Sequence, residues 1–450
     1  MAAGAGLRAL ALLAYPRPFL FYDSYSYLAN AEHLVPRPVR PLGYAAWLWL
    51  LPLGDGLTAV AVVQHLMGLL IAGALYVLLL RLNVRPLIAA LAVVPVLLDA
   101  YQIDLEHYVL AETLFELLIV AAAIALLWRR PARPIAIAFA GALLAAAALT
   151  RASGLTLILP ALLAALFTGV GWRRAALMAG CFAVPVLAYM AAFDALHGSF
   201  SLTGFEGRFL YGRVAPFADC SAFAVPRDER PLCPRQPPGR RASVSAFTWS
   251  RHSPVHRLRD PHSPLIAQFA RRVILHQPLD YAAHVATDMG RGFALTRTRH
   301  PGEPPIAYWQ FPLTWRVYVP PGVGARARGA RGHVRRQLAS ALRSYQLDGG
   351  YTPGPLMAAA LFVGALAVAG VAGARGSGLR APALLFCGLG IALLATSMAV
   401  ATFSWRYWIP ELVLMPPAGA IGITALTQRR SPPQKAIAQG GNVVSDLRVD

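Results

Sequence analysis

The chain has 450 residues, of which 57% are hydrophobic and only 14% are charged. Soluble globular proteins average about 25% charged residues, so this composition excludes an ordinary water-soluble fold and predicts a polytopic membrane protein. The formal net charge is +20. The basic residues form short clusters between apolar runs, which argues against a nucleic-acid-binding protein.

Ten apolar runs are candidates for membrane-spanning helices, which need about 20 mostly apolar residues each. The first run, Leu7 to Phe21, is short and contains Arg8 and Pro16, and a cleaved signal peptide is the alternative interpretation. The other nine lie near residues 57–80, 86–101, 108–128, 134–150, 152–170, 174–195, 353–373, 381–401 and 407–427. We therefore expect an all-α polytopic membrane protein with about ten transmembrane helices.

Arginine clusters occupy every second connection between these runs. They are Arg81 and Arg85; Arg129, Arg130 and Arg133; Arg173 and Arg174; Arg375 and Arg380; and Arg429 and Arg430. Short loops rich in arginine stay on the cytoplasmic side, so both termini are expected to be cytoplasmic. The segments expected outside are 22–56, 102–107, 196–352 and 402–406.

The external segment 196–352 is too long and too polar for a simple connector, so we expect a large, partly ordered loop domain. Ser263 with Pro264 predicts a helix start, and a second helix is predicted from Pro278 to Arg291. Cys220 and Cys233 are predicted to form a disulfide if this segment faces an oxidising compartment. The expected divisions are a transmembrane module at 1–195, the loop domain at 196–352, C-terminal transmembrane helices at 353–427 and a disordered cytoplasmic tail at 428–450.

Acidic residues accumulate in the first two external segments. Asp23 begins a short helix predicted to lie at the membrane surface, where the alternative is that it only caps that helix. His107 ends the second external segment. Glu112 and Glu116 follow on one face of a helix that enters the bilayer, where ionisable groups usually face a cavity or a partner. The alternative is that a neighbouring arginine simply holds both acids.

Two arginines lie in short outer turns, against the general bias of arginine toward the cytoplasmic side. Arg151 lies in an outer turn, and Arg406 lies in the last external turn, followed by Tyr407. An arginine in that position predicts a phosphate or carboxylate partner. We expect four of these residues to lie at the same depth, at the outer ends of the helices: Asp23, Glu112, Arg151 and Arg406. That convergence is the main indication of function.

The order of these motifs resembles the GT-C glycosyltransferases that use a polyprenyl-phosphate sugar, a group that includes protein mannosyltransferases and aminoarabinose transferases. The matching elements are Asp23 with Tyr27 and Ala29 after it, Arg40-Pro41-Leu42-Gly43-Tyr44, Ala111-Glu112-Thr113-Leu114-Phe115, Leu149-Thr150-Arg151 and Arg406-Tyr407. The resemblance covers roughly residues 20 to 200 and the last external turn. This chain has one Asp where many of these enzymes have an acidic pair.

The resemblance implies a GT-C-like architecture and an inverting glycosyltransferase of the bacterial plasma membrane, with its active site on the extracytoplasmic side. Asp23 would be the catalytic base for the acceptor hydroxyl, and Arg151 and Arg406 would hold the phosphate of the donor. The other substrate-binding residues expected are Tyr27, His107, Glu112 and Tyr407. No cofactor is assigned with certainty and no metal ligand set is predicted, and use of a divalent cation is an alternative. The acceptor could be a protein, a lipid or a polysaccharide.

Three other functions stay open. An O-antigen ligase or polymerase-like enzyme would use arginine and histidine on a long external loop, and segment 196–352 has many of both. A lipid or glycolipid transporter would need charged groups near the bilayer midplane, where the apolar runs have almost none. The third alternative is a scaffold without catalytic activity. Four aromatic residues of the loop could bind a sugar, but we expect them instead to pack the loop onto the membrane. They are Trp309, Phe311, Trp315 and Tyr318.

Overall fold

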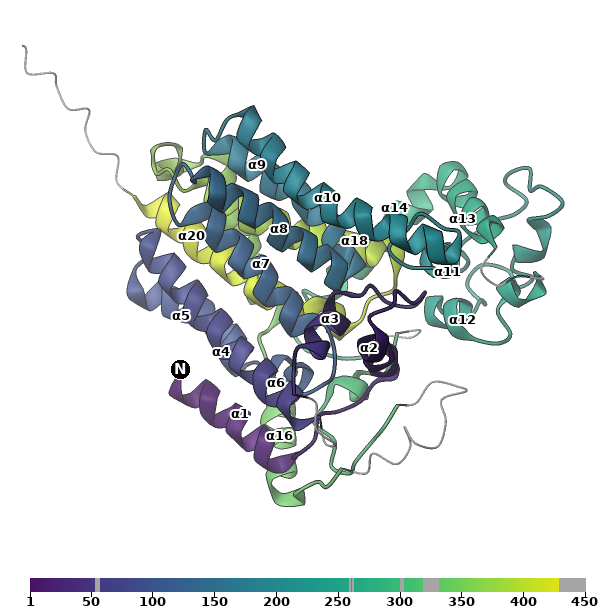
Figure 1. The fold of residues 1–450 in the computed structure, drawn as a ribbon, viewed down its shortest axis with the longest axis horizontal. Coiled ribbons are helices and arrows are strands. Elements are labelled where there is room, and N and C mark those ends of the chain that lie inside the picture. Colours follow the sequence, from purple (N-terminus) through teal and green to yellow (C-terminus); the bar gives the residue numbers. More distant parts are fainter. Residues whose placement is uncertain (53–56, 259, 261–262, 300–302, 319–331, 429–450) are drawn as a thin grey trace, which may run out of the picture.

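The computed structural model describes residues 1–52, 57–258, 260, 263–299, 303–318 and 332–428. Over these residues the ordered elements are helices, and β-pairing is limited to isolated bridges, which confirms the predicted all-α class. Figure 1 shows a bundle of long helices with a smaller helical lobe at one side. The predicted tail beyond residue 428 lies outside the described residues.

Long apolar helices form the bundle. α8 packs between α7 and α10, α17 lies along α20, and α18 contacts both α17 and α20. Their facing sides bury leucine, alanine, valine and isoleucine, which supplies the close helix-to-helix packing of the core. The bounds are α4 (Thr58–Arg81), α5 (Pro86–Leu98), α7 (Glu112–Leu127), α8 (Pro134–Thr150), α9 (Ile158–Phe167), α10 (Trp172–His197), α17 (Gly354–Ala369), α18 (Arg380–Val400) and α20 (Met415–Thr427).

Four helical segments are long and apolar enough to cross a membrane. They are α4, α10, α18 and the combined segment Trp405–Thr427, which comprises α19 (Trp405–Trp408), the 3-10 turn Ile409–Val413 and α20. A fifth span results if α5 and α6 (Ala100–Glu106), which meet at an angle of 52°, count as one. The predicted ten spans are not confirmed, because several apolar runs form helices of only 10 to 17 residues.

Local sequence features explain why some runs are shorter than expected. The first helix, α1 (Ala2–Ala14), ends before Pro16, which cannot donate the backbone hydrogen bond that a longer helix needs. At the α5–α6 bend, the Asp99 side chain accepts a hydrogen bond from the backbone N–H of Tyr101 and so starts a new helix. Residues 108–111 are not helical, since the N–H of Val109 donates to the carbonyl of Phe19.

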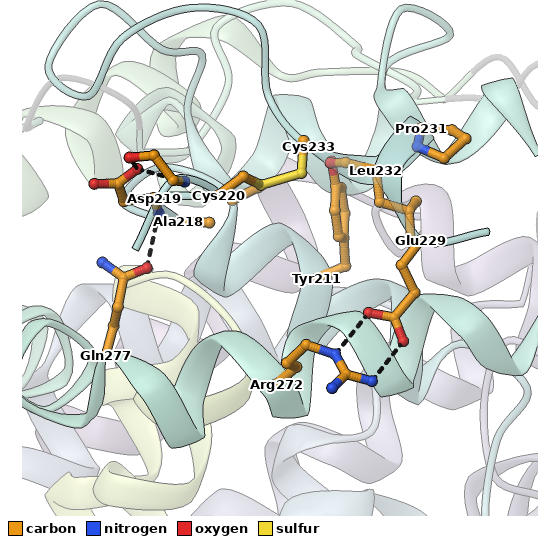
Figure 2. The surroundings of a disulfide bond; sticks show 12 residues. Tyr211, Ala218, Asp219, Cys220, Glu229, Pro231, Leu232, Cys233, Arg272 and Gln277 are labelled. Carbon is orange, nitrogen blue, oxygen red and sulfur yellow. Dashed lines mark hydrogen bonds and ion pairs between the residues drawn. A yellow bond between two sulfur atoms is a disulfide. The ribbon is translucent and has the colours of Figure 1, made fainter. Parts of the chain in front are cut away.

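The smaller lobe comes from the first half of the long polar segment. It contains α11 (Glu206–Val214), α12 (Val244–Trp249) and α13 (Pro264–His276) around a core of its own. Figure 2 shows the Cys220–Cys233 disulfide in this lobe, above the ion pair between Glu229 and Arg272. Ser263 caps α13, and α14 spans Pro278–Arg291, so both predicted helices are confirmed.

The second half of that segment packs on the bundle instead. The 3-10 turn Ile306–Trp309 contacts α6, and α16 (Arg336–Leu347) packs beside α1 and α6. Trp309 is 4% exposed and Phe311 is fully buried, so these aromatic rings attach the segment to the helices. The segment therefore closes over the same end of the bundle that carries α2 (Tyr22–His33) and α3 (Gly43–Trp49).

Candidate active site

Asp23 is the second residue of α2, and the start of this helix leaves its carboxylate free for other partners. Phe21 occupies the N-cap position, and its N–H donates to the Ser24 hydroxyl oxygen at 2.9 Å. The Ser24 hydroxyl in turn donates to the carbonyl of Val109, just before α7. The alternative that Asp23 only caps the helix is therefore wrong.

Five charged side chains from distant parts of the chain meet at this end of the bundle. Arg40 donates to Asp23 Oδ1 at 2.8 Å, and Arg406 donates through Nη1 to Asp23 Oδ2 at 2.6 Å. Arg406 also donates through Nε to Glu112 Oε1, which accepts a second hydrogen bond from Arg151. We call this set the Asp23 network. It joins α2, the turn before α3, the start of α7, the end of α8 and α19.

The network is buried and carries an excess of positive charge. Asp23 is 7% exposed and Glu112 is fully buried. Three guanidinium groups face two carboxylates, which leaves one net positive charge. Among the described atoms, Arg40 Nε and Glu112 Oε2 lack hydrogen-bond partners. Buried polar groups normally have partners, so unfilled capacity of this kind favours a bound ligand or water.

Electrostatics keep Asp23 ionised. Burial by itself raises the pKa of its carboxyl group, but the adjacent guanidinium groups of Arg40 and Arg406 outweigh burial and hold that pKa well below its ordinary value. In this arrangement Asp23 is a fixed anion and a weak proton acceptor. It can become a stronger base only if a guanidinium group moves away.

Aromatic rings fix the guanidinium groups in place. The Arg151 guanidinium carbon lies 5.6 Å from the ring centroids of Phe115 and Tyr407. Arg406 lies 5.6 Å from the ring of Trp309. Such cation–π contacts add an attraction that persists without a counter-anion.

A close backbone contact brings two of the sequence motifs together. A Cβ atom on Gly43, at the start of α3, would lie 2.7 Å from the backbone carbonyl of Leu149 near the end of α8. Only glycine leaves room for this approach, which holds the Arg40 turn beside Arg151.

A cavity of about 1000 Å³ opens over the network. Arg40, Arg151 and Arg406 line it, together with Tyr27 and Tyr407. Its other walls come from the ends of α10 and α18 and from α11 and α13 of the lobe. We call it the ion-pair cavity. It lies at the upper end of the usual 300–1000 Å³ range of small-molecule sites, so it has room for more than one small ligand.

Most of the residues selected from the sequence meet in this place. Asp23, Glu112, Arg151 and Arg406 form one network, and Tyr407 packs beneath Arg151. Tyr27 is also at the site, where its ring packs edge-on against Tyr44.

Two placements differ from the sequence-based expectation. His107 is fully buried and absent from both the network and the cavity lining, so it cannot orient a substrate there in this conformation. Arg40 is a site residue to which the sequence alone assigned no role, since it was named only within the motif Arg40-Pro41-Leu42-Gly43-Tyr44. Its position next to Asp23 required the tertiary contact between α2 and the turn before α3.

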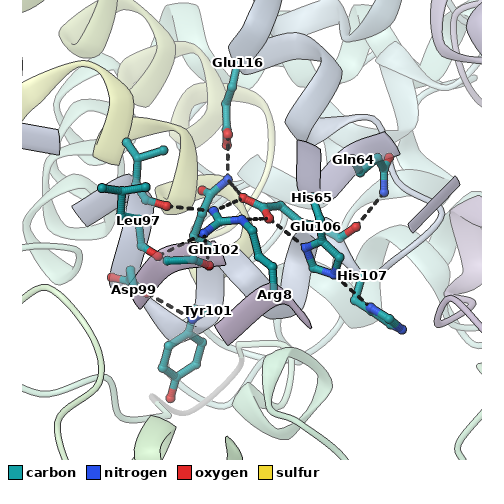
Figure 3. A network of polar contacts seen from close by, with 12 residues as sticks. Arg8, Gln64, His65, Leu97, Asp99, Tyr101, Gln102, Glu106, His107 and Glu116 are labelled. Carbon is teal, nitrogen blue, oxygen red and sulfur yellow. Dashed lines mark hydrogen bonds and ion pairs between the residues drawn. The ribbon is translucent and has the colours of Figure 1, made fainter. Parts of the chain in front are cut away.

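His107 belongs to a second buried set of polar side chains, shown in Figure 3. Arg8 donates to both oxygens of Glu106, at 2.8 and 2.7 Å. His65 Nδ1 lies 2.9 Å from Glu106 Oε2, and His65 Nε2 lies 3.0 Å from His107 Nδ1. Gln102 connects Glu106 to Glu116. We call these six residues the Glu106 network.

The hydrogen bonds of the Glu106 network require a shared proton. His107 Nε2 faces the carbonyl of Arg17 at 3.0 Å and must donate to it. A neutral His107 then accepts from His65 Nε2, so a proton must also lie between His65 Nδ1 and Glu106. Gly68 leaves the space for this packing, since a Cβ atom there would lie 2.1 Å from Glu106 Oε1.

No protein-family model, curated protein or solved structure matches this chain. Within the described residues, no group of three or more His, Cys, Asp or Glu side chains is arranged to hold a metal ion.

Proposed function

We propose that the protein is an inverting glycosyltransferase that moves a sugar from a polyprenyl-phosphate donor to an acceptor hydroxyl at the outer face of a bacterial plasma membrane. One observation carries this proposal: a carboxylate, Asp23, is held between arginines that line a large cavity at one end of apolar helices. Glycosyl transfer from a phosphate needs a base and a cationic phosphate site at such a place.

The proposed reaction is a single displacement. The acceptor oxygen attacks the anomeric carbon as the bond between that carbon and the phosphate oxygen breaks. The hydroxyl proton moves to the Asp23 carboxylate, and the bonding electron pair leaves with the phosphate. The products are the glycoside, with inverted configuration, and the polyprenyl phosphate. A lipid-linked phosphate is already a good leaving group, so positive charge near it replaces the need for a general acid.

The network also supplies a reason for ordered binding. Arg406 bridges Asp23 and Glu112, and its guanidinium group could move from Asp23 to a phosphate that enters the cavity. Donor binding would then remove a cation from Asp23 and raise the pKa of its carboxyl group, which makes it a stronger base when the acceptor arrives. Glu112 would retain Arg151 and keep the phosphate site assembled.

The cavity walls suit the two parts of the donor. The charged floor at Arg151 and Arg406 matches the phosphate, while Leu155, Val400 and the 55% exposed Phe200 provide apolar surface at its sides. A polyprenyl chain can leave between these apolar helix ends into the bilayer. The lobe helices α11 and α13 remain to contact the acceptor.

The decisive experiment is transfer from a panel of synthetic polyprenyl-phosphate sugars by the purified protein and by its Asp23→Asn variant. We expect Asp23→Asn to lower the transfer rate about 10²- to 10⁴-fold, the usual contribution of a general base, while donor affinity changes little. Asp194→Asn, an exposed position near the end of α10, is the matched control and should transfer sugar normally. Normal transfer by Asp23→Asn would contradict the proposed role of Asp23.

A lipid or glycolipid transporter is the second candidate, and the Glu106 network favours it. Its residues are buried between α1, α4, α6 and α7, and three of them, Arg8, His65 and Glu116, lie within apolar runs of the sequence. Liposomes that contain the protein separate the two functions. Movement of labelled polyprenyl-phosphate sugar across the bilayer without a covalent product would support transport and contradict transfer.

A further inference from the structure

A second cavity, of about 890 Å³, lies at the opposite end of the bundle. The ends of α4, α7 and α9 and the start of α18 surround it, and five arginines line it: Arg81, Arg129, Arg130, Arg375 and Arg380. We call it the arginine cavity. α18 contributes Arg380 to this cavity and Val400 to the ion-pair cavity, and its 21 residues measure roughly 31 Å. That length matches the hydrocarbon core of a bilayer, about 30 Å.

The charge in the arginine cavity is all of one sign. No acidic residue lines it, and none of its five arginines belongs to an ion pair within the part of the chain that the structure describes. The Asp23 network differs, since its arginines are largely neutralised by carboxylates. Five guanidinium groups around one hollow repel one another, and an anion with several oxygens would offset that repulsion.

Several of these side chains are held in position without an anion. Arg81 donates to the carbonyl of Trp128 at 2.5 Å, Arg130 donates to the carbonyl of Gly378 at 2.6 Å, and Arg380 donates to the carbonyl of Val368 at 3.1 Å. Each of these guanidinium groups keeps further N–H donors. A planar guanidinium group offers paired donors that fit a phosphate, so the cavity is preorganised for one.

Two aromatic rings at the cavity support the arginines and also face outward. Arg81 lies 4.8 Å from the ring centroid of Trp128, and Arg380 lies 5.2 Å from that of Phe167. Trp128 is 41% exposed and Phe167 is 55% exposed. The cavity therefore has an apolar rim as well as a basic interior. A water-soluble anion would use only the basic interior, whereas a lipid would use both.

An exposed apolar stripe continues from this rim along α9. Leu159 and Leu163 precede Phe167 at intervals of four residues, so the three side chains share one face of the helix. They are 61%, 57% and 55% exposed. The stripe begins at the arginines and runs toward the middle of the bundle. An acyl chain whose headgroup occupied the cavity would lie against it.

We propose that the arginine cavity binds the phosphate headgroup of an anionic phospholipid, with an acyl chain along the Leu159–Leu163–Phe167 face of α9. Basic pockets between helices at a membrane surface are suited to such headgroups. This inference does not depend on the glycosyltransferase proposal, because the residues involved are at the other end of the helices.

The test compares lipid binding to the purified full chain in neutral detergent by native mass spectrometry. Phosphatidylglycerol and phosphatidylcholine with the same acyl chains are the two lipid probes. The variant is Arg129→Gln with Arg375→Gln, since both side chains are exposed and neither is used in a described hydrogen bond. The matched control is Arg85→Gln with Arg173→Gln, which removes the same charge from exposed positions outside the cavity.

We expect the unchanged protein to prefer phosphatidylglycerol, and the Arg129/Arg375 variant to bind it about 30-fold more weakly, from the attraction that two surface arginines provide. The control pair should bind it as the unchanged protein does. Equal binding of both lipids, or an equal loss in the control pair, would overturn the proposal. So would inorganic phosphate that binds as tightly as phosphatidylglycerol and displaces it, because the ligand would then be a free anion.

A charge-preserving variant guards against a loss of folding or orientation. Arg129→Lys with Arg375→Lys keeps the basic ends of the helices but loses the planar donors. It should bind phosphatidylglycerol with an affinity between those of the unchanged protein and the glutamine variant. The lysine pair could instead bind phosphatidylglycerol as weakly as the glutamine pair, with a normal thermal unfolding temperature. Positive charge at positions 129 and 375 would then contribute nothing to binding, which would contradict the proposal.

Discussion

The Asp23 network and the Glu106 network are built from the same kinds of residues, yet they differ in what surrounds them. Both networks pair arginine with carboxylate groups, and most of their members are at least 90% buried. The Asp23 network borders a cavity. Among the described atoms, each network has two without hydrogen-bond partners: Arg40 Nε and Glu112 Oε2 in the Asp23 network, and Gln102 Oε1 and Glu116 Oε1 in the Glu106 network. The Glu106 network is enclosed, and Arg8 divides its donors between Glu106 and the carbonyls of Gly4, Val96 and Leu97.

The difference separates two uses of a buried charge. In the Glu106 network, Arg8 satisfies the last carbonyls of α5 and holds α1 and α6 against it, so its charge serves assembly. In the Asp23 network, the shared guanidinium of Arg406 can exchange one carboxylate for another anion, so its charge is available to a ligand. Burial alone does not distinguish the two, whereas an adjoining cavity does.

The largest expected effect is on stability and comes from the enclosed network. Glu106→Gln leaves the guanidinium group of Arg8, which is 2% exposed, without its counter-charge. Breaking a buried ion pair in this way costs about 3–5 kcal/mol. Thermal unfolding in detergent should show a clear fall in midpoint temperature.

A double variant tests whether the pair itself is the cause. Arg8→Met together with Glu106→Gln removes both charges and should regain most of the lost stability, because replacing both partners is often nearly neutral. A double variant as unstable as Glu106→Gln alone would show that Arg8 acts through its backbone contacts and not through the ion pair.

The next effect is on activity and comes from the open network. Arg406→Lys keeps the positive charge, but an ammonium group cannot bridge Asp23 and Glu112 through two fixed donors. We expect kcat/KM for the donor to fall about 10- to 100-fold, the cost of losing one charged hydrogen bond of about 1.5–3 kcal/mol. Steady-state kinetics with varied donor check this. An unchanged kcat/KM would remove Arg406 from the proposed phosphate site.

The smallest effect is a shift in pH dependence. Asp23 has a pKa below its ordinary value of 3.8, so its ion pairs contribute stability above about pH 4 and lose it as the pH falls toward the lowered pKa. Arg40→Gln removes one of the two cations and should raise the pKa of Asp23. The acid limb of the kcat/KM profile should then move to higher pH, by about one unit for about 1.4 kcal/mol of lost interaction. If the acid limb of the profile does not move, it reports the titration of a group other than Asp23.

Parts of the fold follow from local sequence features. The helix that starts at Ser263 and Pro264 and the helix Pro278–Arg291 were predictable because capping residues and proline mark their starts. The count of ten spans was not, because apolar composition does not reveal where a run is interrupted. Asp99 bends one run and the backbone pairing of Val109 with Phe19 shortens another, and both are effects of neighbouring segments.

The candidate site could be predicted in part for the same reason. Asp23, Glu112, Arg151 and Arg406 stand out in the sequence, because a charge next to an apolar run needs a partner. Arg40 was given no role, and His107 lies away from the cavity, since the turn before α3 and the fold of α6 decide which buried group each one meets.

Composition by itself determined that this chain buries apolar helices, because 57% hydrophobic residues cannot be shielded by so few charged ones. The sequence also places most charges at the ends of apolar runs and in the connections, where a charged side chain costs least, whereas Arg8 and Glu116 lie inside helices. Only the tertiary structure decided which charges meet. Ion pairs such as Asp23 with Arg406 join residues 383 positions apart, and their geometry depends on helix crossings that local sequence does not specify.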